Sequence, residues 1–263
     1  MMILRRLAEG LRRRDWFTIF MEVVIVVVGV FIGIEVSNWN QERQNRAMAE
    51  SYLQRLSADL GAEAVTWEDA LQYFRTTHRH ARAALEAFET PADQLDERFL
   101  IDLYQASQER NLSIRSATYD ELVSTGGIEY LADSQFREAL GIHYDLSYRR
   151  QAVVEDITEY RPTVRRHMDF RLQDAIVDAC GDEYVPHPFG YAGVRLPESC
   201  EIELADEPVE KEIRRLHANL EVEQHLRYQL SNLRSRIQAL ESALDGTLNM
   251  RSAVQQLIEE KNQ

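Results

Sequence analysis

The most apolar stretch of the chain lies between Trp16 and Trp39 and reads WFTIFMEVVIVVVGVFIGIEVSNW. Its only charged residues are Glu22 and Glu35. A helix of about 20 apolar residues is long enough to cross the roughly 30 Å hydrocarbon core of a bilayer. A buried core helix would carry a polar stripe, and a cleaved signal peptide would end in a small-x-small site, which the residues after Glu35 do not provide. The pattern therefore predicts an uncleaved transmembrane helix over 16–39.

After this span, apolar residues recur at helical spacing almost to the end of the chain. From Asn40 to Phe88 there is no proline, and Gly61 is the single glycine. The segment is predicted to be one long helix, with continuity into the membrane helix as one option. Its apolar stripe consists of Tyr52, Leu53, Leu56, Leu60, Trp67, Leu71 and Phe74.

Capping residues, prolines and glycines predict where the next helices begin and end. Residues 90–93 (Thr-Pro-Ala-Asp) predict a helix start, and this helix is expected to run to about Glu109. Residues 118–121 (Thr-Tyr-Asp-Glu) fit a capping box, and the glycines at 126–127 fit the stop of the short helix that it opens. Another short helix is expected to start near residue 133.

The second half is also helical in pattern. The segment 144–176 reads as a helix that Pro162 must kink or split. A long helix is predicted from residue 207 to Gly246, followed by a last helical piece over 249–260. The apolar seam of the long helix consists of Val209, Ile213, Leu216 and Leu220, then Leu230, Leu233, Ile237, Leu240 and Leu244.

The sequence shows no alternating strand pattern, so we expect an all-α fold. An N-terminal transmembrane helix should be followed by an antiparallel bundle of long helices. The expected parts are a basic amphipathic cytoplasmic segment (1–15), the transmembrane helix (16–39), the first part of the bundle (40–179), a Cys-bracketed loop (180–206), and a C-terminal long helix with its tail (207–263).

Flanking charges predict the direction of the span. Five arginines precede it, whereas Arg43 and Arg46 after it alternate with acidic residues. Excess positive charge marks the cytoplasmic side, so we expect a bacterial inner-membrane protein with a cytoplasmic N-terminus and a periplasmic body. Trp16 and Trp39 are placed as interfacial anchors. The apolar residues of 1–15 fit either an amphipathic helix on the inner leaflet or a frayed basic tail.

Three residues of the span suggest more than anchoring. Gly29 and Gly33 form a small-xxx-small pair, which allows two helices to approach closely. Glu22 lies seven residues before Gly29 and therefore faces roughly the same side. A carboxylate within a span is costly and suggests helix pairing or function. A homodimer through this face is one option, and a simple anchor whose Glu22 reaches the headgroups is the other.

The charge of the chain excludes one class of partner. The formal net charge is −14, and because residues 1–39 contribute +1, the remainder carries −15. A nucleic-acid-binding protein needs a basic footprint, so no nucleic-acid partner is expected. The expected partners are the lipid bilayer and an unknown membrane or periplasmic protein.

The two cysteines, Cys180 and Cys200, enclose a stretch that is rich in proline, glycine and aromatic residues. In an oxidising compartment they would form a disulfide, which agrees with a periplasmic body. The alternative is two unrelated thiols. A zinc site is not favoured, because His187 is the only histidine between them and no CxxC spacing exists.

Other candidate groups favour structural interpretations. His78 and His80 would point about 200° apart on a helix, so a solvated basic patch is expected there. His217, Glu221 and His225 have the spacing of one helix face, but a solvated face is favoured over a metal site. Arg165 and Arg166, with Arg161 and Arg171 nearby, form a locally basic stretch. It could receive a carboxylate ligand, but pairing with nearby acids is favoured. No catalytic residues, metal or cofactor are predicted, so we do not expect an enzyme.

The segment EVVIVVVGVFIGIEVSNWNQER resembles the N-terminal signature of a bacterial family of unknown function, the domain-of-unknown-function 6090 family. The match rests on Glu22, Gly29, Asn38, Trp39, Asn40 and Arg43. SYLQRLSADL and TYDELVSTGGIEYL are similar to later segments of that family. The resemblance covers roughly the first half of the chain, and it implies a membrane-anchored helical protein without an established activity.

Two functions follow as hypotheses. The first is a scaffold or assembly partner that works through helix contacts, which a continuous exposed apolar strip would favour. The alternative is a sensor-like ligand-binding bundle that signals through a partner protein, which a polar pocket lined by Arg161, Arg165 or tyrosines would favour.

Overall fold

The computed structural model describes residues 16–186, 192–202 and 206–261. The fold is all-α, as predicted, apart from one two-stranded hairpin. The chain divides into two compact units, Met1–Ser51 and Tyr52–Gln263. The predicted basic segment 1–15 lies outside the described residues.

Helix α2 (Trp16–Ala87) is one continuous helix of 72 residues, which confirms the predicted long helix and its continuity with the apolar segment. Its N-terminal part is the one described stretch that is long and apolar enough to cross a membrane. Nearly all of the side chains described there are exposed, including Trp16 and Trp39 at its two ends.

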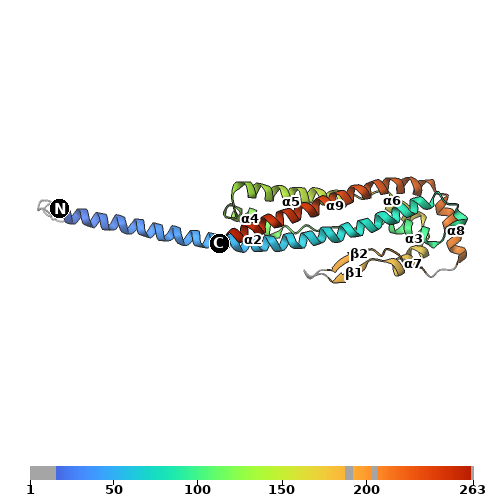
Figure 1. Cartoon of the computed structure of the whole chain (residues 1–263), viewed down its shortest axis with the longest axis horizontal. Helices are drawn as coiled ribbons and strands as arrows, with labels where there is room; N and C mark the ends of the chain where they lie inside the picture. The colour runs from blue at the N-terminus through green and yellow to red at the C-terminus, as the bar shows by residue number, and fades with distance from the viewer. Residues whose placement is uncertain (1–15, 187–191, 203–205, 262–263) are drawn as a thin grey trace, which may run out of the picture. The chain divides into compact units, whose positions relative to one another are not determined.

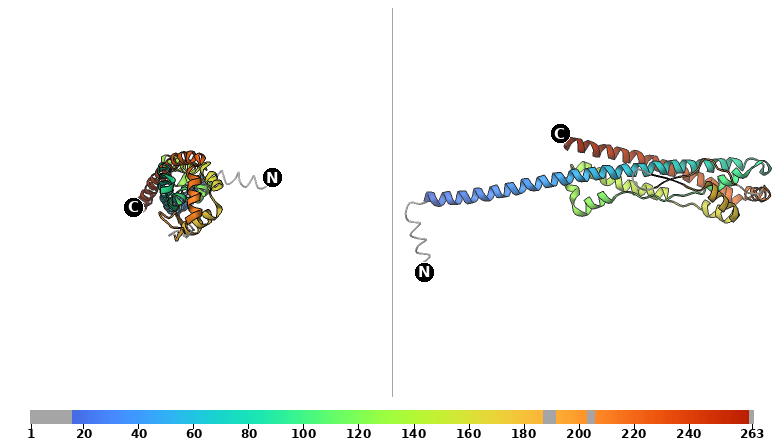
Figure 2. Two further views of the ribbon diagram at one scale, coloured as in Figure 1. Left: turned by 90° about the vertical axis from the view of Figure 1, so that its right-hand side faces the viewer. Right: turned by 90° about the horizontal axis from the view of Figure 1, so that it is seen from below.

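In the unit Tyr52–Gln263, three long helices lie side by side (Figures 1 and 2). They are the later part of α2, α5 (Ser134–Val154) and α9 (Leu220–Lys261). Helix α9 runs antiparallel to α2, because the pairs Glu63–Thr247 and Arg75–Glu241 connect them in opposite order. It also runs antiparallel to α5, because Arg150 contacts Ser242 and Asp156, just after α5, contacts Arg236. The predicted apolar stripe of α2 is buried along its full length, with Tyr52 the most exposed of its residues at 9%.

Shorter elements close the two ends of this bundle. One apolar cluster gathers around Trp67, Phe74 and Tyr160, and a second around Leu56 and Tyr144. The remaining elements are η1 (Ala92–Gln94), α3 (Glu97–Gln105), α4 (Ala117–Thr125), η2 (Gly127–Tyr130), α6 (Tyr160–His167), α7 (Phe170–Cys180), β1 (Glu183–Pro186), β2 (Ala192–Arg195) and α8 (Asp206–His217).

The helix predicted from residue 90 to Glu109 is shorter than expected. Residues 92–94 form only a 3₁₀ turn, and α3 begins later, where the Asp96 carboxylate accepts the backbone N–H of Arg98 (3.0 Å). A side chain that satisfies a free N–H of the first turn marks a helix start. Asp96 therefore caps the helix in place of the predicted residue Thr90. Helix α3 ends at Gln105, four residues before the predicted end.

The capping box predicted at 118–121 is also displaced. Helix α4 starts two residues earlier, after Ser116, and Thr118 lies inside it with its hydroxyl donating to Asp59 Oδ2 (2.6 Å). The predicted stop is confirmed, because Gly126 has φ 73°, a left-handed conformation that favours glycine.

Two predictions about the middle of the chain are confirmed. Asp133 caps α5 by accepting the N–H of Phe136 (2.8 Å), although the helix that follows is long rather than short. The region 144–176 is split, with Pro162 in the first turn of α6, where a proline costs no helical hydrogen bond.

The predicted C-terminal helix 207–246 is divided differently. It breaks after His217, and the Asn219 side chain caps α9 by accepting the N–H groups of Glu221 and Val222. Helix α9 then continues through Gly246. Gly246 is a packing position, because a Cβ there would lie 3.3 Å from Nη1 of Arg150.

The strands were not expected from the sequence. Within the Cys-bracketed loop, β1 pairs with β2 antiparallel, with Glu183 opposite Arg195 and Pro186 opposite Ala192. Four residues in each strand are too few to produce a clear alternation.

Candidate functional site

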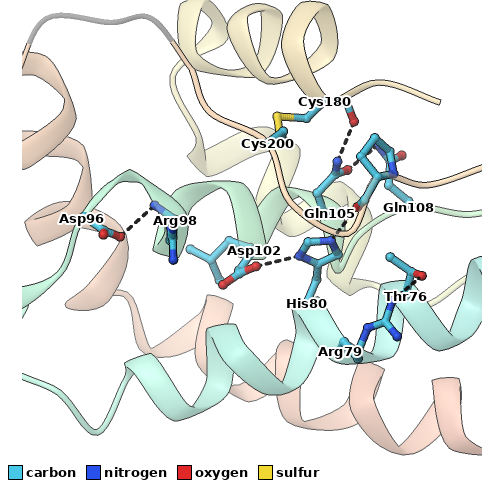
Figure 3. A network of polar contacts seen from close by, with 12 residues as sticks. Thr76, Arg79, His80, Asp96, Arg98, Asp102, Gln105, Gln108, Cys180 and Cys200 are labelled. Atoms are coloured by element: carbon cyan, nitrogen blue, oxygen red, sulfur yellow. Dashed lines mark hydrogen bonds and ion pairs between the residues drawn. A yellow bond between two sulfur atoms is a disulfide. The ribbon is translucent and has the colours of Figure 1, made fainter. Parts of the chain in front are cut away.

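The loop between α7 and α8 is held against the helices by a disulfide and two hydrogen bonds (Figure 3). Cys180 and Cys200 are joined, with their Cα atoms 5.6 Å apart. The carbonyl of Cys180 accepts a hydrogen bond from Gln105 Nε2 (2.6 Å). The carbonyl of Pro197 accepts one from His80 Nε2 (3.2 Å). The segment that ends at Cys200 is therefore a fixed wall beside α2.

His80 of α2 is a buried residue that contacts this wall, so the predicted solvated patch is wrong for it. Its side chain is only 7% exposed, and Nδ1 lies 2.6 Å from Asp102 Oδ1. Its two ring nitrogens thus face a carboxylate and a carbonyl, which are both acceptors. Arg79 remains exposed and pairs with Glu198 (2.6 Å).

A cleft of about 490 Å³ lies between α2 and this wall. Helix α2 supplies one side, and the hairpin with the segment after it supplies the other. The cleft is lined by Gln72, Tyr73, Arg75, Thr76, Arg79, Glu183, Arg195, Leu196, Pro197, Glu198 and Ser199. No local sequence pattern indicates this site, because its walls are more than 100 residues apart in the chain.

Arg161 and Arg165, two arginines of the predicted basic stretch, make their contacts within the protein. Arg161 Nη1 donates to the carbonyl of Ser107 (2.7 Å). The guanidinium of Arg165 lies 3.4 Å above the centre of the Tyr104 ring. Burial lowers the pKa of Arg165 to about 10. These contacts fix α6 against the segment after α3.

Helix α9 carries a buried charge that the sequence did not predict. Arg236 on α9 is 1% exposed and donates to the carbonyl of Asp156. Glu109 Oε1 lies 4.0 Å from its Nη2. Burial raises the pKa of Glu109, although Arg161 and Arg236 oppose the shift. Burial likewise lowers the pKa of Arg236. The apolar spacing of α9 gave no signal for a buried arginine.

The outer face of α5 carries a row of exposed apolar side chains, here called the α5 strip. Its members are Ile142 (52% exposed), Leu146 (38%), Val153 (45%) and, just after the helix, Ile157 (68%). Steps of four and seven residues keep Ile142, Leu146 and Val153 on one side of α5, and Ile157 follows the end of the helix. Arg149 interrupts the row and pairs with Asp145 (2.9 Å).

The residues predicted for helix pairing are exposed in the unit Met1–Ser51. Glu22, Gly29 and Gly33 share one side of α2 by their spacing. A Cβ at either glycine would meet nothing within 4 Å. Helix pairing through this face stays a prediction.

The side chains of His217, Glu221 and His225 do not meet at one point, because each contacts a different residue. His217 is the last residue of α8, before the break in the helix, and its ring stacks on that of Phe88. Glu221 lies 3.1 Å from His167, and His225 lies 2.8 Å from Thr163. Among the residues that the structure describes, no group of three metal-ligating side chains is found.

Comparison of the chain with protein-family models, with curated proteins and with solved structures found no match. The resemblance to the domain-of-unknown-function 6090 family stays a prediction.

Proposed function

We propose that the protein is a non-catalytic, membrane-anchored scaffold that binds a partner protein along the α5 strip. The apolar part of α2 would anchor it in a bacterial inner membrane. The arginines before the span support a cytoplasmic N-terminus and a periplasmic unit Tyr52–Gln263. The disulfide between Cys180 and Cys200 supports an oxidising compartment for that unit.

The α5 strip is the observation that carries this proposal. Single exposed apolar residues are ordinary on soluble domains. Three on one side of α5, with a fourth just after its end, resemble the seam that a second helix covers. The row is short, so binding would be weak in solution. Anchoring both partners in one membrane raises their effective concentration and offsets that weakness.

Charge on the strip favours a different protein over a second copy. Arg149 stands in the middle of the row. In a parallel pairing of two copies it would face its own counterpart, and like charges at such a seam oppose pairing. The partner we propose presents a helix with an apolar row and a carboxylate opposite Arg149.

Site-specific cross-linking tests this proposal in cells that express the full chain. A photo-reactive residue at Val153 should give an adduct with one partner. Leu146→Glu should abolish the adduct, whereas Val177→Glu, at an exposed position on α7, should retain it. The partner peptide should also come from an amphipathic helix. A missing adduct, an adduct unaffected by Leu146→Glu, or an adduct with a second copy of the chain would each reject the proposal.

A second candidate function is ligand binding with signalling through a partner. The cleft between α2 and the disulfide-linked wall favours it. The arginines named for this function in the sequence, Arg161 and Arg165, are not among the residues that line this cleft.

A further inference from the structure

Two opposite charges in the cleft face each other without pairing. Glu183 and Arg195 are direct partners in the β1–β2 ladder, and both line the cleft. Opposed residues of two antiparallel strands project from the same face, with Cβ atoms about 5 Å apart. Both side chains are exposed, and neither has an ion-pair or hydrogen-bond partner among the described residues.

The other arginines of the cleft already have partners. Arg75 pairs with Glu241 (2.8 Å), and Arg79 pairs with Glu198 (2.6 Å). Glu183 and Arg195 are thus the carboxylate and the guanidinium of the cleft that form no ion pair among the described residues. They suit a ligand that carries one charge of each sign.

The cleft has the size and the rigidity of a small-molecule site. Its volume of about 490 Å³ lies within the usual range for such sites. The disulfide at Cys200 and the hydrogen bond from His80 to Pro197 fix the wall that follows Arg195. A site that is already ordered loses little entropy when a ligand binds.

We propose that this cleft binds a free α-amino acid as its zwitterion, with the carboxylate on Arg195 and the ammonium group on Glu183. The chain after residue 39 carries a charge of −15, which would repel a simple anion. A zwitterion has no net charge and avoids that repulsion. The proposal rests on the second candidate function and is independent of the α5 strip, whose cross-linking test gives a separate result.

Calorimetric titration of the purified full chain in lipid nanodiscs tests this assignment. Each standard amino acid is titrated at millimolar concentration. The best ligand is then compared with its amide, which lacks the carboxylate charge, and with its N-acetyl form, which lacks the ammonium. Arg195→Gln and Glu183→Gln are measured beside Arg234→Gln and Glu201→Gln, which make the same charge changes at exposed positions outside the cleft.

The expected result is a crossed pattern. The native chain should prefer the free amino acid to both derivatives by about tenfold. Arg195→Gln should remove the preference over the amide only, and Glu183→Gln the preference over the N-acetyl form only. The two controls should keep both preferences. No binding by any standard amino acid, or equal loss of affinity for all probes in both variants, would overturn the proposal.

Discussion

The side chains of Glu63 and His143 meet inside the bundle, with Glu63 Oε2 3.5 Å from His143 Nε2. Glu63 is fully buried, and its Oε1 accepts hydrogen bonds from Trp67 Nε1, Ser147 Oγ and Thr247 Oγ1. One carboxylate therefore connects α2, α5 and α9. Burial of a carboxylate is tolerated only when such partners surround it.

Removal of this carboxylate should destabilise the bundle strongly. In Glu63→Ala the three donors to Oε1 lose their acceptor, so the free energy of unfolding should fall by about 3 kcal/mol or more. Glu63→Gln retains an oxygen acceptor and should cost clearly less. Denaturant unfolding followed by tryptophan fluorescence compares the two variants. An equal loss in the two variants would mean that the negative charge of Glu63 matters, rather than the volume of its side chain or an acceptor that Gln also supplies.

Gly246 offers a stabilising substitution. Glycine in a helix interior is less favourable than alanine by about 1 kcal/mol. The only close neighbour of an added Cβ would be Nη1 of Arg150 at 3.3 Å, the end of a flexible side chain that can move slightly. Gly246→Ala should therefore raise the free energy of unfolding by up to about 1 kcal/mol. The same substitution in an Arg150→Ala background should give at least that gain, and a loss in both backgrounds would contradict the explanation.

The apolar stripe of α2 and the environment of Gly246 show which features the sequence predicts and which it does not. The apolar period of α2 predicted the stripe that packs in the core, because burial of such a stripe depends on the helix itself. The role of Gly246 depends on a side chain from α5, and no local pattern contains that information. The cleft likewise needs α2 and the segment after β2 to meet, so its residues were not found. Glu63 and Arg236 are charged, and a helical pattern predicts burial for apolar residues only. Their burial was therefore not predicted from the sequence either.

The buried carboxyl of Glu109 should make stability depend on pH. Burial raises its pKa in the folded chain above the unfolded value of 4.5. The folded state then binds the proton more tightly, so the stabilising contribution is complete below pH 4.5 and is lost as the pH rises through the higher folded pKa. Across this window, native stability should fall relative to Glu109→Gln. Unfolding measured at several pH values gives the difference in slope, and parallel curves would refute it.

Loss of the disulfide should loosen the cleft wall. Cys180 and Cys200 are 20 residues apart, and closing a loop of this size stabilises a fold by about 3 kcal/mol. Cys180→Ser with Cys200→Ser should show this loss, and reductant should produce it in the native chain. In intact cells without reductant, neither cysteine should react with a thiol reagent. Labelling of both would place the body in a reducing compartment and reject the proposed topology.

The span itself can be tested for helix pairing. Gly29→Leu with Gly33→Leu should weaken self-association of the full chain in lipid vesicles by about tenfold, because the close approach of two helices is lost. Neither leucine would clash within the chain, since a Cβ at each glycine meets nothing within 4 Å. Misfolding would therefore not explain a loss.

The matched control is Val27→Leu with Phe31→Leu, which changes the opposite side of the same helix. Energy transfer between labelled copies measures association for both pairs. If only the glycine pair weakens it, the face that also carries Glu22 is a pairing surface. If both pairs retain the native signal, or lose it equally, the glycine face has no special role. The apolar segment would then serve as an anchor alone, and a partner would have to be held by the α5 strip.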